Sequence, residues 1–315
     1  MIDAQDVSPM TEGTDDSLEG VQLSFIGCGV MAEAMIAGLL RQKLVTAGQI
    51  TGSHPREARR DELESKYGVR MVESNRAAAS EAQASGADEA TAHGSSRLSA
   101  RSGQIVILAV KPQRLGGVLS ELKGAVSPEG LVISIVAGAT IETISGELLH
   151  GAVVRAMPNT PAQIGQGMTA WVATPEVDEK QQGQVRALLG ALGREMLVEK
   201  ERMIDMATAL SATGPTYIFL VMEALVDAGV HMGFSRHVAQ ELVLQTMLGS
   251  VLFARESHKH PAELRNMVTS PGGTSAEAIY QMEKGGLRTV LSKAVYSAYQ
   301  RAVALGKTEG RKPEK

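Results

Sequence analysis

The sequence predicts an α/β protein in which a mostly parallel sheet is followed by an all-helical region. Short β-branched runs such as "QIVILAV" (104–110) and "LVISIVAG" (131–138) alternate with helix-forming segments as far as residue 200. Such alternation is typical of a parallel sheet covered by helices on both faces. Beyond residue 200 the strand pattern ends and apolar residues follow helical spacing. We therefore expect two domains, over 21–200 and 201–310.

We expect eight strands in the first domain, each of them short and rich in apolar residues. The first strand leads into a glycine turn and an apolar helix, and further helices are expected over 55–67 and 176–192. Residues 76–103 are rich in Ala, Ser and Gly and lack bulky apolar residues, so we expect an inserted loop with a helical start. The expected strands lie within 21–26, 47–54, 69–71, 104–110, 131–138, 152–159, 168–173 and 194–200.

Composition and charge exclude several classes of protein. The net charge of -4 and the aromatic content of 3% argue against nucleic acid as a partner. The single cysteine cannot form an internal disulfide, which favours the cytoplasm. Residues 1–20 carry six acidic residues and no basic one, which is unlike a secretory signal, and we expect a disordered leader. No uninterrupted apolar run approaches the roughly 18 residues that a membrane span needs, so no membrane is expected.

The second domain contains a helix that is apolar on nearly every side. This is the segment "GPTYIFLVMEALVDAGVHMG", residues 214–233. A helix of this kind has to be buried on all sides. Pairing of two copies would bury it, and so we predict a homodimer. Packing against the first domain is the alternative explanation.

A glycine turn follows the first strand. Gly27, Gly29 and Ala32 fit the pattern G-x-G-x-x-G/A at the point where the strand meets the helix. The first glycine permits the tight turn, the second lets a pyrophosphate approach the backbone, and the small third residue allows close packing. The motif alone is weak, but here it opens the first strand of an alternating pattern. It predicts a Rossmann-type dinucleotide-binding domain.

The end of the second strand indicates which dinucleotide is bound. NAD sites carry an Asp or Glu there to hold the ribose 2′-hydroxyl. This sequence has Ser53, His54 and Arg56, with no carboxylate before Glu57. A hydroxyl, an imidazole and a guanidinium suit a 2′-phosphate. NADP(H) is therefore the preferred cofactor and NAD(H) the alternative. If Arg56 is only an exposed surface residue at the start of a helix, it has no role in cofactor binding.

Four motifs, taken in order, resemble those of pyrroline-5-carboxylate reductase, the final enzyme of proline biosynthesis. They are "FIGCGVMAEAMIAGL" (25–39), "AVKPQ" (109–113), "MPNTP" (157–161) and "TSPGGTS" (269–275). The resemblance covers residues 21–305 without the insertion, and "GGLRTVLSKAV" is also similar. It implies a Rossmann-type domain, a helical dimerisation domain, dimers or rings of dimers, and reduction of 1-pyrroline-5-carboxylate to L-proline by NAD(P)H.

The resemblance also assigns site residues. The residues that would meet the substrate carboxylate are Thr274 and Ser275. One stretch departs from the family pattern: "SATGPTY" (211–217) stands where the family commonly has Ser-Gly-Ser-Gly-Pro-Ala-Tyr, which bears on substrate specificity. The residues that would line the cofactor are Ile26, Gly27, Cys28, Gly29, Val30, Met31, Asn75, Ala109, Val110, Lys111 and Pro112.

The Pro-Gly-Gly stretch itself suggests an anion site. Pro271, Gly272 and Gly273 predict a turn, and Thr274 with Glu277 fits the capping box T-x-x-E. A helix entrance presents N–H groups and the positive end of its dipole, and the glycines leave it accessible to a carboxylate. A capped helix without a ligand is the structural alternative.

The predicted reaction needs no nucleophile and no metal ion. A cyclic imine accepts hydride directly, so the protein has to hold the two carbons roughly 3–3.5 Å apart. We predict that Thr213 or Tyr217 orients the ring or relays a proton. One alternative is an NADP-dependent reductase of another imine or a hydroxy acid. The latter needs a Lys or His base, and the long helix has no Lys. A second alternative is a non-catalytic NADP(H)-binding protein.

Overall fold

The computed structural model describes residues 16–84 and 103–308. The chain divides into two compact units, Met1–Thr208 with Ala302–Lys315, and Ala209–Arg301. The second unit thus begins after the boundary expected at residue 201, and the chain returns to the first unit at its end. Most of the expected leader and most of the expected insertion lie outside the described residues.

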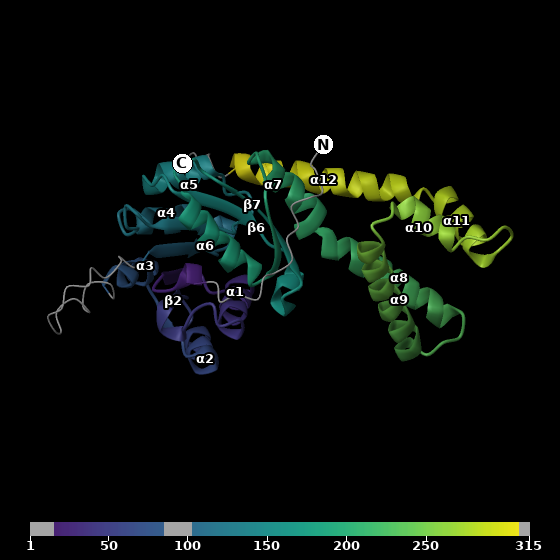
Figure 1. The fold of residues 1–315 in the computed structure, drawn as a ribbon, viewed down its shortest axis with the longest axis horizontal. Coiled ribbons are helices and arrows are strands. Elements are labelled where there is room, and N and C mark those ends of the chain that lie inside the picture. Colours follow the sequence, from purple (N-terminus) through teal and green to yellow (C-terminus); the bar gives the residue numbers. More distant parts are fainter. Residues whose placement is uncertain (1–15, 85–102, 309–315) are drawn as a thin grey trace. The chain divides into compact units, whose positions relative to one another are not determined.

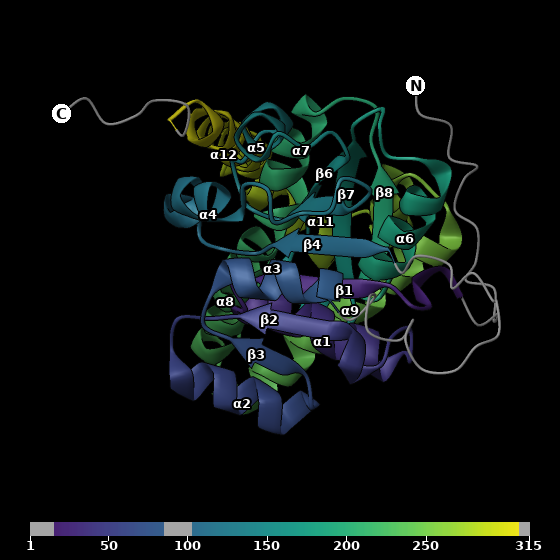
Figure 2. The ribbon, with the colours of Figure 1, turned by 90° about the vertical axis from the view of Figure 1, so that its left-hand side faces the viewer.

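An eight-stranded sheet forms the centre of the first unit, in the order β3-β2-β1-β4-β5-β6-β7-β8. Neighbouring strands are parallel except β6 and β7, which are antiparallel. Figure 2 shows the run from β3 to β4. Each expected strand segment overlaps one of these strands. Their bounds are Gln22–Ile26 (β1), Ile50–Ser53 (β2), Arg70–Val72 (β3), Gln104–Leu108 (β4), Leu131–Ser134 (β5), Val153–Met157 (β6), Gly167–Ala173 (β7) and Gly193–Leu197 (β8).

Helices cover both faces of the sheet, as the alternating pattern predicts. In β4, Ile105 and Ile107 belong to one apolar cluster, while Val106 and Leu108 belong to the other. This follows from the alternation of side chains along a strand, and it explains why the central strands are apolar throughout. The first cluster includes residues of α1 (Val30–Arg41), α2 (Glu57–Tyr67) and α6 (Glu179–Gly190). The second includes residues of α3 (Asn75–Ala84), α4 (Leu115–Leu122) and α5 (Ile141–Leu148).

Helix α3 lies at the start of the expected insertion. Residues 76–84 are helical, and Ala78 and Ala79 are fully buried. The Ser24 hydroxyl donates to the Ala78 carbonyl at 2.9 Å, and the Gln104 amide donates to the Ala79 carbonyl at 2.6 Å. Alanines cover little area, but they let the helix backbone approach the sheet closely. The structure thus has the helical start that the sequence predicts, and its small residues are buried although the segment lacks bulky apolar side chains.

Short helices complete the first unit, which also receives the last turns of α12 (Leu287–Thr308). Gly138 has a φ of +81° and lies so close to α12 that a Cβ there would be 2.8 Å from the Cβ of Leu305. The short helices are η1 (Asp16–Leu18), η2 (Ala47–Gln49), η4 (Pro112–Arg114), η5 (Thr160–Ile164), α7 (Arg202–Ala207) and, continuing into the second unit, the π-turn η6 (Thr208–Ala212).

The second unit is helical, as predicted. It contains α8 (Gly214–His231), α9 (Arg236–Ser257), α10 (Pro261–Met267), α11 (Thr274–Lys284) and most of α12. Helices α8 and α9 form a hairpin and run side by side in Figure 1. A Cβ on Gly229 would be 2.9 Å from the Cβ of Ala239, so small residues set this close approach.

The apolar side chains of α8 are largely exposed in the single chain. Phe219 is 61% exposed and Leu220 is 66% exposed. The continuous helical stretch Arg202–His231 is also the one described segment that is long and apolar enough to cross a membrane, and 11% of its most apolar window is buried. Only the length and the apolar composition of the segment indicate that it could cross a membrane. A helix that is buried between two copies of the chain has the same apolar composition.

Candidate functional site

The expected cofactor residues of the first unit lie together at the carboxyl ends of the central strands of the sheet. Strand β1 lies between β2 and β4, and Ile26 at its end pairs with Ser53 on one side and Leu108 on the other. The glycine turn, the His54 loop and the Ala109–Pro112 loop follow these three strands directly. Ligands of open α/β sheets bind at such a topological switch point, outside the carboxyl ends of the strands.

The two glycines of the turn have different surroundings. Gly27 has a φ of +87°, and a Cβ there would lie 2.5 Å from Cγ1 of Val110. Gly29 is the N-cap of α1 with a φ of −80°, and no atom lies within 4 Å of the position a Cβ would take. Gly27 is therefore required by the fold, whereas Gly29 leaves space at the helix N-terminus beside Val30 and Met31. This is the environment in which a pyrophosphate binds.

Ser53 holds the turn from the second strand. Its carbonyl accepts the N–H of Cys28 at 2.9 Å, and its hydroxyl oxygen accepts the N–H of Gly27 at 3.2 Å. The same hydroxyl donates to Oδ1 of Asn75 at 2.8 Å, and Ser53 is fully buried. The sequence places Ser53 beside the cofactor phosphate. In the structure its hydroxyl supports the backbone of the turn.

Cys28 has the properties of a packing residue. Its side chain is fully buried and lies 3.7 Å from the Phe25 carbonyl. Burial raises the pKa of the Cys28 thiol to about 12, against smaller opposing effects of the Ser53 backbone and the Arg59 charge. A thiol in this state is neutral and unreactive at physiological pH.

Basic residues gather at the start of α2. Arg56 is exposed at the helix N-cap, and its N–H donates to Nδ1 of His54 at 3.2 Å. Burial, together with the charges of Arg56, Arg59 and Arg60, lowers the pKa of His54. Arg60 donates to the His54 carbonyl at 2.8 Å. The sequence reading did not include Arg59 and Arg60, although "PREARR" contains both.

Arg59 is bound to a carboxylate that the sequence reading also omitted. Glu33 of α1 accepts hydrogen bonds from Arg59, Lys66 and Tyr67. Burial by itself would raise the pKa of Glu33, but these donors together lower it to about 2. The cluster joins the first turn of α1 to α2, and Nε of Arg59 also reaches the Cys28 carbonyl at 3.4 Å.

The Ala109–Pro112 loop closes the other side of the turn. The Ala109 N–H donates to the Ile26 carbonyl at 2.9 Å, which continues the pairing of β1 with β4. Val110 packs against Gly27, and Lys111 is the exposed N-cap of η4, with Pro112 in its first turn.

The Pro-Gly-Gly stretch forms the turn that the sequence predicts, but the capping box was wrong. The Gly273 N–H donates to the Ser270 carbonyl at 3.1 Å and Gly272 has a φ of +71°, so the residues form a type II turn. Gly273 is the N-cap of α11 and Thr274 is already its first residue, with no side-chain cap. The turn places the glycine one position ahead of the hydroxyl, so Thr274 cannot reach back over the helix start.

The entrance of α11 is open. Its first backbone acceptor, the Gly273 carbonyl, takes the N–H groups of Ala276 and Glu277. The N–H groups of Thr274 and Ser275 precede these bonds, and Gly272 has no atom within 4 Å of a Cβ position. This geometry leaves N–H groups and the positive end of the helix dipole available for an anion.

The two residues predicted to act on the substrate lie at the start of α8. The Tyr217 hydroxyl donates to the Ala209 carbonyl at 3.0 Å, in the π-turn that precedes the helix. Its oxygen keeps lone pairs that can accept another hydrogen bond. Thr213 is the N-cap of α8.

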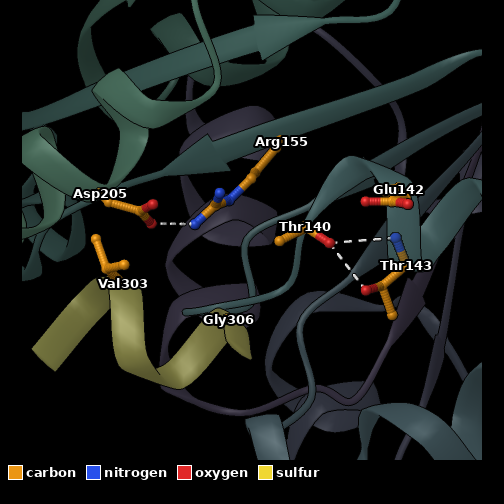
Figure 3. Close-up of a pocket in the computed structure, with 7 residues that line it drawn as sticks. All are labelled: Thr140, Glu142, Thr143, Arg155, Asp205, Val303 and Gly306. Atoms are coloured by element: carbon orange, nitrogen blue, oxygen red, sulfur yellow. Dashed lines mark hydrogen bonds and ion pairs between the residues drawn. The ribbon is translucent and has the colours of Figure 1, made fainter. Parts of the chain in front are cut away.

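A buried arginine lines a separate cavity of about 530 Å³ in the first unit (Figure 3). Arg155 of β6 is 2% exposed and pairs with Glu201 at 3.0 Å and Asp205 at 2.5 Å. Glu201 also accepts the N–H of Ile141 at 2.8 Å. The network ties β6 and the start of α5 to the segment around α7. Its signal in the sequence is a single charge within the apolar strand "VVRAM".

His258 and His260, two residues apart in "SHKHP", lie at helix ends. His258 ends α9 with a φ of +52°, and Nδ1 of His260 accepts the Ala262 N–H at the start of α10. Within 16–84 and 103–308, no group of three or more His, Cys, Asp or Glu residues is arranged to hold a metal ion.

Two protein families match parts of the chain. Residues 201–305 match the family described as pyrroline-5-carboxylate reductase dimerisation. Residues 22–138 match the family described as NADP oxidoreductase coenzyme F420-dependent. The first match covers the helical region, and the second covers the strands and loops that form the cofactor edge.

Whole-length relatives agree with these matches. The chain is 39% identical to pyrroline-5-carboxylate reductase of Synechocystis sp. over 287 residues, which is 91% of this chain and 99% of the relative. It is 34% identical to the solved structure of a pyrroline-5-carboxylate reductase from Coxiella burnetii, with a TM-score of 0.77 and coverage of 91% and 98%. A Plasmodium falciparum pyrroline carboxylate reductase solved with NADP bound also has a TM-score of 0.77, at 28% identity and coverage of 92% and 99%. The chain therefore belongs to the pyrroline-5-carboxylate reductase family of oxidoreductases.

Proposed function

We propose that this protein reduces 1-pyrroline-5-carboxylate to L-proline with NADPH as the hydride donor. Its relatives in bacteria and plants carry the name pyrroline-5-carboxylate reductase. One observation of the structure carries the proposal: an open glycine turn at the switch point of a parallel sheet, with Gly29 unobstructed at the N-terminus of α1.

The cofactor is assigned to the edge of the sheet. The N–H groups of Val30 and Met31 would hold the pyrophosphate, since the Gly29 N–H already donates to the Gly27 carbonyl at 2.9 Å, and the Ala109–Pro112 loop would flank the dinucleotide. Arg56 and His54 would bind the 2′-phosphate. Arg56 is exposed, and no carboxylate stands at the end of β2 where an NAD site would have one. Arg59 already pairs with Glu33 and is a weaker candidate.

The substrate carboxylate is assigned to the entrance of α11. The N–H groups and hydroxyls of Thr274 and Ser275 would bind its oxygens, with Gly272 keeping the approach open, while Gly273 is needed for the turn because a Cβ there would lie 2.5 Å from Oγ of Ser270. The Tyr217 oxygen, which donates its own proton to Ala209, would accept a hydrogen bond from the ring nitrogen. Thr213 would orient the ring from the neighbouring position.

The reaction makes few chemical demands on the chain. When bound, NADPH supplies a hydride to the imine carbon, and a proton on the ring nitrogen completes the secondary amine. The residues have to orient the imine, bind its carboxylate and exclude water. The neutral Cys28 thiol is not required.

The helical unit is a dimerisation region, and two copies of the chain form a homodimer through it. The exposed apolar side chains of α8 support this pairing. We extend the proposal to rings of dimers in the cytoplasm, with a small molecule and neither nucleic acid nor a membrane as partner.

Loss of NADPH absorbance in the presence of the cyclic imine tests the proposal. Steady turnover is expected, with Ser275→Ala raising KM for the imine and leaving the affinity for NADPH unchanged. Tyr217→Phe should lower kcat. Binding of NADPH without turnover would favour a non-catalytic protein. Turnover with other imines alone would favour a different reductase of the same build.

A further inference from the structure

We infer that Glu121 of α4 is a positioning residue for the cofactor turn, acting through Asn75 and Ser53. The inference rests on the proposed NADPH site at that turn. Glu121 is exposed and belongs to no motif of the sequence, yet it is joined to the first glycine of the turn through an unbroken line of hydrogen bonds.

The line consists of three hydrogen bonds. The Asn75 amide donates from Nδ2 to Oε2 of Glu121 at 2.7 Å. The Ser53 hydroxyl donates to Oδ1 of Asn75 at 2.8 Å, and the Gly27 N–H donates to the Ser53 oxygen at 3.2 Å. The bonds connect α4, the first residue of α3, the end of β2 and the glycine turn.

The carboxylate fixes the direction of these bonds. An Asn amide can lie in either of two orientations that exchange its oxygen and its nitrogen, and its surroundings decide between them. A carboxylate only accepts hydrogen bonds, so Glu121 takes Nδ2 and turns Oδ1 of Asn75 toward Ser53. The single hydroxyl proton of Ser53 then points at Asn75. The lone pairs of the Ser53 oxygen remain available to accept the Gly27 N–H.

The opposite orientation would disturb the turn. With the amide reversed, Nδ2 of Asn75 would donate to the Ser53 oxygen, which would then have to share its two lone pairs between Nδ2 and the Gly27 N–H. The Ser53 proton would then turn to the Phe25 carbonyl, which lies 3.4 Å away. Gly27 has no side chain with which to hold its left-handed conformation, so a weakened N–H bond loosens the turn directly.

Neighbouring residues keep Asn75 and Glu121 in place. Ser74 caps α3 through its hydroxyl, which accepts the Ala77 N–H at 3.2 Å and leaves the Asn75 side chain for the relay. Arg76 donates to the carbonyls of Glu121 and Lys123 at 3.1 and 3.2 Å, which fastens α3 to the end of α4. The helices are thus joined independently of the Glu121 carboxylate.

Titration of the full-length protein with NADPH, followed by fluorescence, tests the inference. Glu121→Ala should raise Kd for NADPH roughly 3- to 10-fold, as expected for loss of one charge-assisted hydrogen bond near a binding site. Glu121→Gln keeps an acceptor oxygen but also has a donor that permits the reversed amide, so it should raise Kd less than Glu121→Ala does. Glu147→Ala, an exposed substitution on α5, is the matched control and should change nothing.

A double substitution adds a sharper readout. Asn75→Asp alone places two carboxylates together and should weaken binding more than Glu121→Ala does. Combining Asn75→Asp with Glu121→Gln restores one donor and one acceptor, with the Asp oxygen still accepting from Ser53, and should recover part of the lost affinity. Additive losses in the double variant would overturn the relay.

The outcomes separate this inference from the proposed function. Wild-type protein that binds no NADPH would overturn the proposed function itself. Wild-type binding with an unchanged Kd in Glu121→Ala would overturn the inference alone. Equal losses of affinity in Glu121→Gln and Glu121→Ala, accompanied by a lowered Tm, would show a role in stability instead and would also overturn it.

Discussion

The two glycines of the cofactor turn should respond to the same substitution in opposite ways. In Gly27→Ala, the new Cβ would lie 2.5 Å from the Val110 side chain and 3.1 Å from the Val110 backbone, at a φ of +87°. In Gly29→Ala, the new methyl group meets no atom within 4 Å, and the φ of −80° suits any residue. The first change acts on the fold, and the second acts on the space in which a pyrophosphate would lie.

The magnitudes follow from these surroundings. A left-handed conformation costs a non-glycine residue about 1–2 kcal/mol. Overpacking against a backbone adds about 1–3 kcal/mol. Gly27→Ala should therefore lower the free energy of unfolding by about 2–5 kcal/mol. Gly29→Ala should lower it by about 1 kcal/mol at most, because alanine is a poorer N-cap than glycine but its methyl group meets no neighbouring atom.

Urea denaturation and NADPH titration of both variants give the test. Gly29→Ala should lose about 1 kcal/mol of stability at most but bind NADPH at least roughly 10-fold more weakly, because the methyl group excludes the phosphate oxygens. The control Gly183→Ala, inside α6 with nothing within 4 Å, should gain about 0.5–1 kcal/mol and bind NADPH normally. Wild-type stability of Gly27→Ala, or wild-type affinity of Gly29→Ala, would refute the reasoning.

Three further outcomes are expected. The Glu33 carboxyl has its pKa lowered from 4.5 to about 2, so the stability it contributes is present above pH 4.5 and lost as the pH falls towards 2. The stability gap between wild type and Glu33→Gln in urea should narrow over that range, and a constant gap would contradict this. Arg155→Met should lower the free energy of unfolding by about 3 kcal/mol, because it leaves Glu201 and Asp205 without their buried partner; a loss below about 1 kcal/mol would show that the ion pairs contribute little. Phe219→Asp should yield monomers in sedimentation experiments, since Phe219 is 61% exposed in the single chain, and an intact dimer would place the interface elsewhere.

Periodicity was sufficient to predict most of the fold. The central strands are apolar on both faces, and the charged α2 ends at Gly68, which adopts the left-handed conformation at the helix C-cap. After residue 76 the sequence predicts a helical start but not the burial of its small side chains. Ala78 and Ala79 contribute little to an apolar pattern, and their burial depends on Ser24 and Gln104, which are distant in the sequence.

Motifs located the candidate site but not its supporting residues. The expected cofactor residues after β1, β2 and β4 meet at one edge because parallel strands bring their carboxyl ends together. Glu33 and Glu121 were not predicted, because their partners lie on other helices and no local spacing marks them. The capping box failed for a local reason, since the type II turn made Gly273 the N-cap in place of Thr274.

The sequence by itself determined the fold class, the family and the glycine turn, because these depend on short-range patterns of apolar residues and glycines. The tertiary structure decided how each polar group is used. It turned the Ser53 hydroxyl toward Gly27 and Asn75, buried Cys28 as a neutral thiol, and divided the basic residues of α2 between the Glu33 carboxylate and solvent. Hydrogen-bond partners and burial are set by packing between distant segments, and no local pattern encodes them.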